Sequence, residues 1–356
     1  MDKKKILFIG IGAAGNKIVN EFLKIDSRYR GLFVNTTAKD LEKLEKSNLD
    51  SNVFLIPNAD GTGKDRDKAK NYVKDDLYSL MDVLGNYKQQ NKIFVVFSMG
   101  GGTGSGISPL IPAIFSKRFS EKTINIIGVS PALKSSKKVL TNALECWNDL
   151  IKMKSLINSF MFIDNDKNLS ENEINKQAVK EFDDMLNISV ASSSNVIDSA
   201  DLSTLLSAKG ATHFYQLNDD YCDDIKTALN KAIKKSVFIE PESKKRIRCE
   251  YLGISLKSKK FDSEDIEDNF RVKEDTFYGN NDKCNMLVMS GCSMPLDMVE
   301  MIEEELKERK SKQKDNDEVE EDLIIKLEEK PKEIKKVDNY QDETNLNDIM
   351  DLIKDL

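Results

Sequence analysis

The sequence predicts an α/β protein that begins with a parallel β-sheet covered by helices on both faces. Short, almost entirely apolar segments alternate with helical stretches from Lys3 to Phe162, which is the pattern of strands buried on both sides. The strand candidates of this region are residues 5–9, 31–35, 52–56, 92–98, 124–129 and 159–163. Glycine-rich segments follow the first and the fourth of these strands, the layout of a Rossmann-like nucleotide-binding domain.

The glycine segment 100–106 is the most informative feature of the chain. It places five glycines and two hydroxyl side chains directly after the strand 92–98. Glycine accepts positive φ and lets backbone N–H groups approach a ligand closely, so such a segment can cradle phosphate oxygens. A helical pattern follows Pro109, and the start of a helix also favours anions. Because the segment lies between a strand and a helix, a flexible linker is the weaker alternative.

A second glycine segment, 10–16, follows the strand 5–9 and has the spacing G-x-G-x-x-G. By itself it also fits a dinucleotide-dependent oxidoreductase, in which the next strand ends in an acidic residue that binds the ribose. Here that strand ends in Asn-Thr-Thr at 35–37, which weakens this alternative. A Walker-type phosphate loop is excluded, because the Gly-Lys pair at 63–64 lacks the required spacing.

Polar loops follow other strands of the predicted sheet, at 58–63, 129–132 and 164–166. Ligands of open parallel sheets bind beyond the carboxyl ends of the strands. We therefore expect all these loops to surround one nucleotide.

Composition restricts the chemistry that this site can use. The five cysteines lack C-x-x-C spacing, which argues against a zinc site or a disulfide framework and predicts buried thiols. His213 is the only histidine, which argues against a Ser-His-Asp triad or a multi-histidine metal site. We expect His213 to be structural, and hydrolysis to use carboxylates, backbone dipoles and a phosphate-bound Mg²⁺ with few or no direct protein ligands.

The net charge of −7 belongs to the C-terminal tail. Residues 311–356 hold 8 basic and 15 acidic residues, and the rest of the chain is balanced. A neutral body gives no reason to expect direct DNA binding, whereas an acidic tail attracts a basic partner. The apolar run at Ile6 stops after four residues, so we expect a cytoplasmic protein with no signal peptide and no membrane contact.

Residues 172–192 have a helical pattern with a broad apolar face, which predicts a long helix between two domains. The following region has strand candidates at 211–217, 249–256 and 285–291 and helices expected at 220–235 and 262–270. It has no glycine loop, so a role at an interface suits it better than chemistry. The expected domains are a nucleotide-binding domain (1–171), the central helix and its following loop (172–204), a smaller α+β domain (205–300), and a charged C-terminal helix and acidic tail (301–356).

The C-terminal part begins with a helix expected from Pro295, which we predict to end in the charged stretch 307–322. Near the end of the tail, apolar residues recur at helical spacing: Leu346, Ile349, Met350 and Ile353. Asn345 is a candidate N-cap for this second helix. Two interpretations stay open: a helix that docks a partner, and a segment that packs back on the body as a helix or simply frays.

Taken together, the glycine segments resemble those of the tubulin and FtsZ superfamily of self-assembling GTPases. Segment 100–106 is identical to the tubulin form of the motif, and segment 10–16 with Asn35 and Thr36 has the order and spacing seen in FtsZ. The resemblance covers roughly residues 3–300. The compact size, the divergent first segment and the charged tail look most similar to TubZ, the plasmid and phage segregation branch.

The resemblance implies GTP and GDP as ligands. Phosphate contacts fall on the two glycine segments, at Gly12, Ala13, Asn16, Gly101, Gly102, Thr103, Gly104 and Ser105. It also implies that Asn35 lies near the phosphates or the water shell of Mg²⁺, and that Gly61 and Gly63 form a turn near the γ-phosphate.

Base and ribose contacts are expected elsewhere. Asn165 and Asn175 are candidates for the guanine edge, because their amides both donate and accept hydrogen bonds. Pro131 and Glu145 are expected to frame the ribose.

Asp198 and Asp201 lie three residues apart in segment 197–202, which is similar to the FtsZ synergy loop. By spacing alone, such a pair is usually a helix cap or a solvated feature. The resemblance implies instead that both acids enter the nucleotide site of a neighbouring subunit and orient the attacking water. A heterologous contact of this kind does not close, so it predicts head-to-tail filaments with assembly-dependent hydrolysis.

The leading hypothesis is a cytomotive GTPase whose filaments move plasmid or phage DNA through a DNA-binding adaptor held by the tail, so that DNA is bound only indirectly. An FtsZ-type cell-division GTPase is the first alternative, and the acidic end at 351–356 argues modestly against it. A dinucleotide-dependent oxidoreductase and a catalytically silent homologue are alternatives from other classes.

Overall fold

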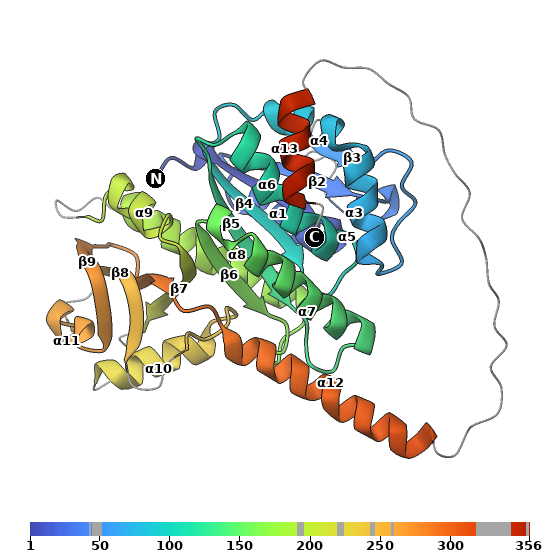
Figure 1. Ribbon diagram of the computed structural model, residues 1–356. Helices are drawn as coiled ribbons and strands as arrows, with labels where there is room; N and C mark the ends of the chain where they lie inside the picture. The colour runs from blue at the N-terminus through green and yellow to red at the C-terminus, as the bar shows by residue number, and fades with distance from the viewer. Residues whose placement is uncertain are drawn as a thin grey trace.

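The computed structural model describes residues 1–42, 44, 52–190, 196–218, 224–242, 246–257, 260–317, 343–353 and 356; of residues 190, 313–317 and 343–346 it describes the backbone alone. The described strands form one sheet in the order β3-β2-β1-β4-β5-β6-β7-β10-β8-β9 (Figure 1). Helices cover both faces of its parallel half, which confirms the predicted α/β class.

The six predicted strands of the first half are present, within two residues of their expected ends. They are β1 Ile6–Ile11, β2 Arg30–Asn35, β3 Val53–Leu55, β4 Lys92–Ser98, β5 Thr123–Ser130 and β6 Ser159–Asp164. All their pairings are parallel. Every residue of β1 is buried, because side chains of alternate residues enter the cores on opposite faces of the sheet.

One face of the parallel strands is covered by α1 (Gly12–Ile25) and α8 (Glu171–Asn187). Aromatic rings join these helices to the sheet. Phe8 of β1 stacks on Phe22 of α1 with ring centroids 3.8 Å apart, and Phe94 of β4 meets Phe182 of α8 edge-on at 5.0 Å. The predicted central helix is α8, and it begins with a capping box between Ser170 and Glu173.

The opposite face carries most of the remaining helices of the first half. These are α3 Arg66–Asp75, α4 Leu77–Gly85, α5 Thr103–Ile107, α6 Ile111–Arg118 and α7 Lys137–Lys152. Both glycine segments are shorter as loops than their sequences suggest. β1 continues to Ile11 and α1 starts at Gly12, while α5 starts at Thr103, so much of each segment forms the first turn of a helix.

The second half continues the same sheet through β7 (Gly210–Leu217), which pairs with β6 over only two residue pairs. The predicted strands β8 (Ile247–Leu256) and β10 (Asn285–Cys292) are present. The predicted helices are shorter, namely α10 Ile225–Lys235 and α11 Ser263–Glu267, and residues 219–223 lie outside the described part of the chain.

The strand β9, Phe270–Asn280, was not predicted, and it overlaps the end of the helix that was expected at 262–270. It lies at the edge of the sheet and pairs with β8. Most of its side chains are exposed or half-buried, so its sequence mixes charged and apolar residues and lacks the apolar run of a central strand.

The helix α12, Leu296–Asp317, continues through the charged stretch in which we expected it to end. Glutamates and basic residues four positions apart pair along it, including Glu305 with Arg309 at 2.6 Å and Glu308 with Lys312 at 3.4 Å. Arg309 also donates to the backbone oxygens of Leu133 and Ser135, at 2.6 and 2.5 Å. Local ion pairs and this anchor explain why the charged sequence stays helical.

The last helix, α13 (Glu343–Ile353), packs on α6, so the structure supports the interpretation of a tail helix packed back on the body (Figure 1). It starts two residues before the expected cap Asn345. None of the helices in the described part of the chain is long and apolar enough to cross a membrane.

Candidate nucleotide site

The two glycine segments touch each other at the carboxyl edge of the sheet. Gly12 has a φ of +73°, and a Cβ added there would lie 3.0 Å from the backbone nitrogen of Gly104. A Cβ on Gly104 would in turn lie 2.9 Å from the carbonyl oxygen of Ile11. Only residues without a side chain allow this approach, which places the starts of α1 and α5 side by side.

A third loop, at residues 58–63, contacts the second glycine segment and the loop after β2. A Cβ on Gly102 would lie 2.3 Å from Oγ1 of Thr62, inside the turn that Gly61 and Gly63 make with φ of +68° and +58°. The amide of Gly61 donates to the backbone oxygen of Thr36 at 2.9 Å. The structure therefore brings together the loops after β1, β2, β3 and β4, as the sequence predicts.

Three threonines from three loops meet at this junction. Oγ1 of Thr103 lies 2.8 Å from Oγ1 of Thr36 and 3.4 Å from Oγ1 of Thr62. Asn35 is buried beside them, where its Oδ1 accepts from the amide of Thr36 at 2.8 Å and its Nδ2 donates to Asp40 at 3.3 Å. Asn35 thus shapes the loop, and its contact with a phosphate or with the Mg²⁺ water shell stays a prediction.

Two buried residues that hold these loops were missed by the sequence analysis. The amide of Asn142, on α7, donates to the backbone oxygens of Lys64, Gly100 and Gly101 at 2.9 to 3.2 Å. Arg66, the first residue of α3, donates to both Oγ and the backbone oxygen of Ser105. Their only signal was a polar residue among the apolar positions of a helix, which by itself names no function.

Arg66 belongs to an ionic cluster with the buried residues Asp149 and Lys70 and with the exposed Glu145. Its guanidinium lies 2.6 Å from Asp149 and 3.1 Å from Glu145, and Lys70 lies 3.0 Å from Asp149. Glu145 pairs with Arg66 and stays exposed, and its predicted place beside the ribose stays a prediction. Ser105 is fully buried between Arg66 and the oxygen of Gly101, so its side chain acts within the loop.

Asn16 lies in α1 and not in a loop. It is fully buried, and its Nδ2 donates to the backbone oxygen of Val34 at 3.2 Å. This amide therefore joins α1 to β2, and its predicted contact with a nucleotide stays untested. Ala13, Gly101 and Thr103 are partly exposed at the starts of the two helices, where a phosphate would approach.

The residues expected to read the base lie after β6. The backbone amide of Asn165 donates to Ser130 at 3.3 Å, next to Pro131, and a Cβ on Gly100 would lie 3.5 Å from Cβ of Pro131. These contacts connect the base and ribose candidates with the glycine segment. Oδ1 of Asn165 is buried without a hydrogen-bond partner among the described residues, and its contact with the guanine base stays a prediction. Asn175 follows on the first turns of α8 and is half-buried.

Asp198 and Asp201 are far from this site. Burial lowers the pKa of the Met1 amino group, and the nearby carboxylates of Asp2 and Asp198 oppose this shift, which places Asp198 near the start of the chain. Ser207, just after α9 (Ser199–Leu205), accepts from Lys92 at the start of β4. Figure 1 shows α9 beside the N-terminus, whereas α3 and α5 lie at the opposite ends of the strands.

The two acids form the capping box of α9. Asp198 accepts from the amides of Ala200 and Asp201 at 2.6 and 2.9 Å, and Asp201 accepts from the amide of Asp198 at 3.0 Å. The capping interpretation of the Asp-x-x-Asp spacing is thus correct as a local description. Asp198 is exposed and Asp201 half-buried, so both carboxylates stay accessible to another molecule.

His213 is buried in β7, away from both regions. Burial lowers the pKa of its ring to about 4, and Nδ1 lies 3.1 Å from the backbone oxygen of Ile239. This agrees with the structural role expected for it. The described cysteines Cys146, Cys249, Cys284 and Cys292 are buried free thiols, also as expected.

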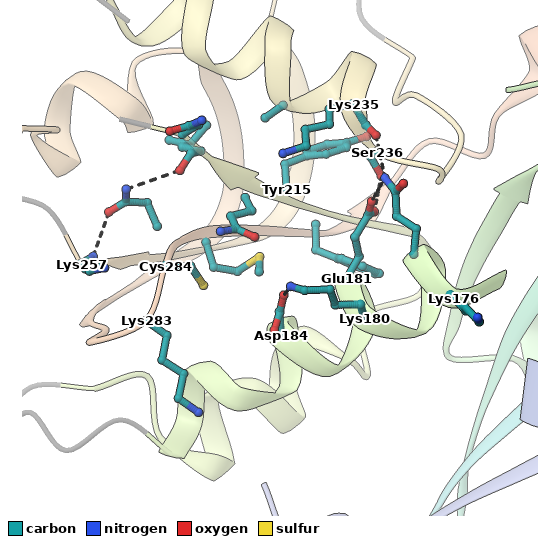
Figure 2. Close-up of a pocket in the computed structure, with 18 of the residues that line it drawn as sticks. Lys176, Lys180, Glu181, Asp184, Tyr215, Lys235, Ser236, Lys257, Lys283 and Cys284 are labelled. Carbon is teal, nitrogen blue, oxygen red and sulfur yellow. Dashed lines mark hydrogen bonds and ion pairs between the residues drawn. The ribbon is translucent and has the colours of Figure 1, made fainter. Parts of the chain in front are cut away.

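A cavity of about 740 Å³ lies elsewhere, between α8, β7, α10 and the start of β10 (Figure 2). Phe214 and Met286 line it together with polar residues, and Glu181 of α8 accepts a hydrogen bond from Ser236 at 2.6 Å at its rim. None of the predicted nucleotide or catalytic residues lines this cavity.

Comparisons with known proteins agree with this geometry. Residues 5–173 match the tubulin/FtsZ family GTPase domain, and residues 201–293 match the C-terminal domain of the tubulin-like protein TubZ. The TubZ of Clostridium botulinum C phage is 30% identical over 97% of this chain and 98% of its own length. The solved structure of Clostridium botulinum phage c-st TubZ with a truncated C-terminal tail, at 31% identity, gives a TM-score of 0.79 over 88% of this chain and all of its own.

A more distantly related solved structure has the same fold. A GTPγS-form protofilament of Bacillus thuringiensis serovar israelensis TubZ, 16% identical, has a TM-score of 0.74 over 89% of this chain and 94% of that chain.

A parallel sheet whose glycine segments and neighbouring loops converge at one edge, joined to a second half with its own family match, defines a two-domain tubulin-like GTPase. The chain belongs to the tubulin/FtsZ family, and both the phage relative and the C-terminal match connect it with the TubZ branch. It binds guanine nucleotide and is a GTPase. The oxidoreductase alternative, weakened by the end of β2, therefore has no support.

Proposed function

We propose that this GTPase assembles head to tail and hydrolyses GTP at the contact between protomers. The observation that carries the proposal is the separation of the two predicted parts of the site. The glycine segments follow the carboxyl ends of β1 and β4, while Asp198 and Asp201 lie at the amino end of β4. A seven-residue strand such as β4 spans about 23 Å, so one protomer cannot bring both parts to one phosphate.

Stacking of protomers along the strands would close this gap, because the acids of one copy then face the glycine segments of the next. The loops of the first copy would bind and orient the phosphates through backbone amides, and the carboxylates of the second would position a water for in-line attack. Mg²⁺, bound chiefly by phosphate oxygens, would neutralise the developing charge. The contact is heterologous and repeats without closing, so it generates a filament.

The protofilament formed by the Bacillus thuringiensis TubZ, a protein of the same fold, supports this arrangement. We further propose that the filaments move plasmid or phage DNA in the cytoplasm through a DNA-binding adaptor held by the tail. The match of the second half to the TubZ C-terminal domain favours this role over that of an FtsZ-type division ring.

A single-turnover experiment tests whether the acids act on a neighbouring copy. Asp201→Ala protein is loaded with GTP carrying a labelled γ-phosphate, then mixed with excess unlabelled GTP and excess unlabelled wild-type protein. We expect little phosphate release from the variant alone and rapid release after wild-type protein is added, because wild-type acids complete the variant's sites. Label that stays unhydrolysed under both conditions would show that Asp201 acts within its own chain, and hydrolysis by the variant alone would remove Asp201 from the reaction.

The control must remove a helix cap without touching the proposed contact. Asp262 caps α11 in the same way, by accepting from the amides of Glu264 and Asp265. Loss of either cap costs about 1 kcal/mol of stability. Asp262→Ala should therefore match Asp198→Ala in thermal stability and keep wild-type turnover, whereas Asp198→Ala loses turnover.

A further inference from the structure

The C-terminal helix α13 covers a surface of the nucleotide-binding half that we call the tail-docking face, formed by α3 and α6. Ile349 and Ile353 are completely buried there and belong to the same apolar core as Ile111, Ile114 and Phe115 of α6. Met350, Leu352 and Leu356 pack against this core and are half-buried. The described apolar side chains of the tail helix are therefore buried or half-buried within the chain.

Charges complement this apolar contact. The carboxylate of Asp348 lies 3.6 Å from Nζ of Lys117 on α6, and Nζ of Lys70 on α3 donates to the backbone oxygen of Leu356. The tail segment 343–356 is acidic overall, and the basic residues that contact it, Lys117 and Lys70, lie at opposite ends of the contact. The face thus fits an acidic amphipathic helix, which is what residues 343–356 supply.

A continuous set of buried contacts leads from this helix to the phosphate-binding segment. Lys70, which holds Leu356, also pairs with Asp149 at 3.0 Å. Asp149 pairs with Arg66 at 2.6 Å, and Arg66 donates to Ser105 in the second glycine segment. Lys70, Asp149 and Arg66 are each at most 5% exposed, so these ion pairs are shielded from water.

We propose that the C-terminal helix is an internal ligand of the nucleotide-binding half and that its docking slows nucleotide release. When α13 leaves, Lys70 loses a partner and water reaches the ionic cluster. Water weakens ion pairs by screening them, so Arg66 then holds Ser105 less firmly. The docking itself does not depend on filament formation or on an adaptor.

The same contact has a consequence for the proposed adaptor. A partner that binds the apolar side of α13 must first remove it from the tail-docking face, because Ile349 and Ile353 cannot be buried in two places. Adaptor binding and docking of α13 on its own chain (cis docking) would therefore exclude each other. A bound adaptor would then favour nucleotide release.

Hydrogen exchange of the full chain with GDP tests the docking. In Ile349→Asp/Ile353→Asp, we expect exchange in α6 and α13 to become at least about tenfold faster, with β4 unchanged as a check of the fold. Asn347→Asp adds one negative charge to the exposed side of α13, against two on the buried side in the release variant, and should leave exchange at the wild-type rate. Lys117→Glu, which reverses one charge of the contact with Asp348, provides a second release variant.

Unchanged protection of α6 in both release variants would overturn the proposal. A wild-type chain that light scattering shows to be a dimer with GDP, and that dissociates in the release variants, would place α13 on a second copy and also overturn cis docking.

Release of a fluorescent GDP analogue tests the link to the nucleotide. We expect at least about threefold faster release from both release variants than from wild-type protein or Asn347→Asp. Exchange that changes while GDP release does not would leave the docking standing and overturn the link to Ser105. A wild-type chain that does not bind the analogue would instead contradict the nucleotide site, so the two failures are distinguishable.

Discussion

Gly104→Ala tests the central feature of the site, the contact between the two glycine segments. The added methyl group would lie 2.9 Å from the carbonyl oxygen of Ile11 and 3.3 Å from Cβ of Phe97. Carbon atoms prefer separations of about 3.5 Å or more, so the starts of α1 and α5 must move apart by about half an ångström. One charge-assisted hydrogen bond to a phosphate is worth about 1.5 to 3 kcal/mol, so losing one would weaken GTP binding about 10- to 150-fold.

Titration of a fluorescent GTP analogue, together with thermal unfolding, gives the readout. Gly85→Ala is the matched control, because its methyl group meets nothing closer than Phe119 at 3.9 Å and it ends a helix. Gly61→Ala has open space but a φ of +68°, so it separates backbone strain from loss of the close approach. If Gly104→Ala binds the analogue as tightly as Gly85→Ala, the two segments do not form a shared phosphate cradle.

Other substitutions have consequences that follow from the same contacts. Asn142→Ala removes three hydrogen bonds to the loops at Lys64, Gly100 and Gly101, so we expect weaker GTP binding and a loss of about 1 to 3 kcal/mol of stability, measured by nucleotide titration and urea unfolding. Arg66→Ala leaves the buried carboxylate of Asp149 short of a partner and should cost about 3 to 5 kcal/mol in the same unfolding experiment; a change below 1 kcal/mol would contradict the role of the cluster. His213 has a folded pKa of about 4 and an unfolded pKa of about 6.5, so the unfolded chain takes up the proton first, and stability is lost as pH falls from about 6.5 towards 4. At pH 5 this loss is about 2 kcal/mol, and His213→Phe should show a smaller drop in melting temperature between pH 7.5 and pH 5 than wild-type protein.

The sequence predicted the parallel half of the fold well, because strands that are buried on both faces have almost entirely apolar sequences. It failed for β9, whose edge position leaves most side chains exposed or half-buried and therefore free of any apolar pattern. It also failed for the end of α12, where pairs such as Glu305 with Arg309 keep a charged sequence helical. The composition of a segment indicates how exposed to water it is, but it does not show which other segments it contacts.

The candidate site shows the same limit. Glycine spacing located the loops, because close backbone approach requires a missing side chain. The supporting residues Asn142 and Arg66 could not be found, since their partners are backbone oxygens distant in sequence. Asn16 was assigned to a loop, and only the start of α1 at Gly12 reveals that its amide faces β2.

The length of the central strands also fixes the distance between the two parts of the proposed site. The glycine segments and the acidic pair lie at opposite ends of the strands, so in the proposed filament the span of β4 would set the minimum step between stacked copies. Substitutions on the outer helices can alter how firmly copies adhere or how fast they separate. The repeat distance of the proposed polymer, however, would be set by the interior of each subunit.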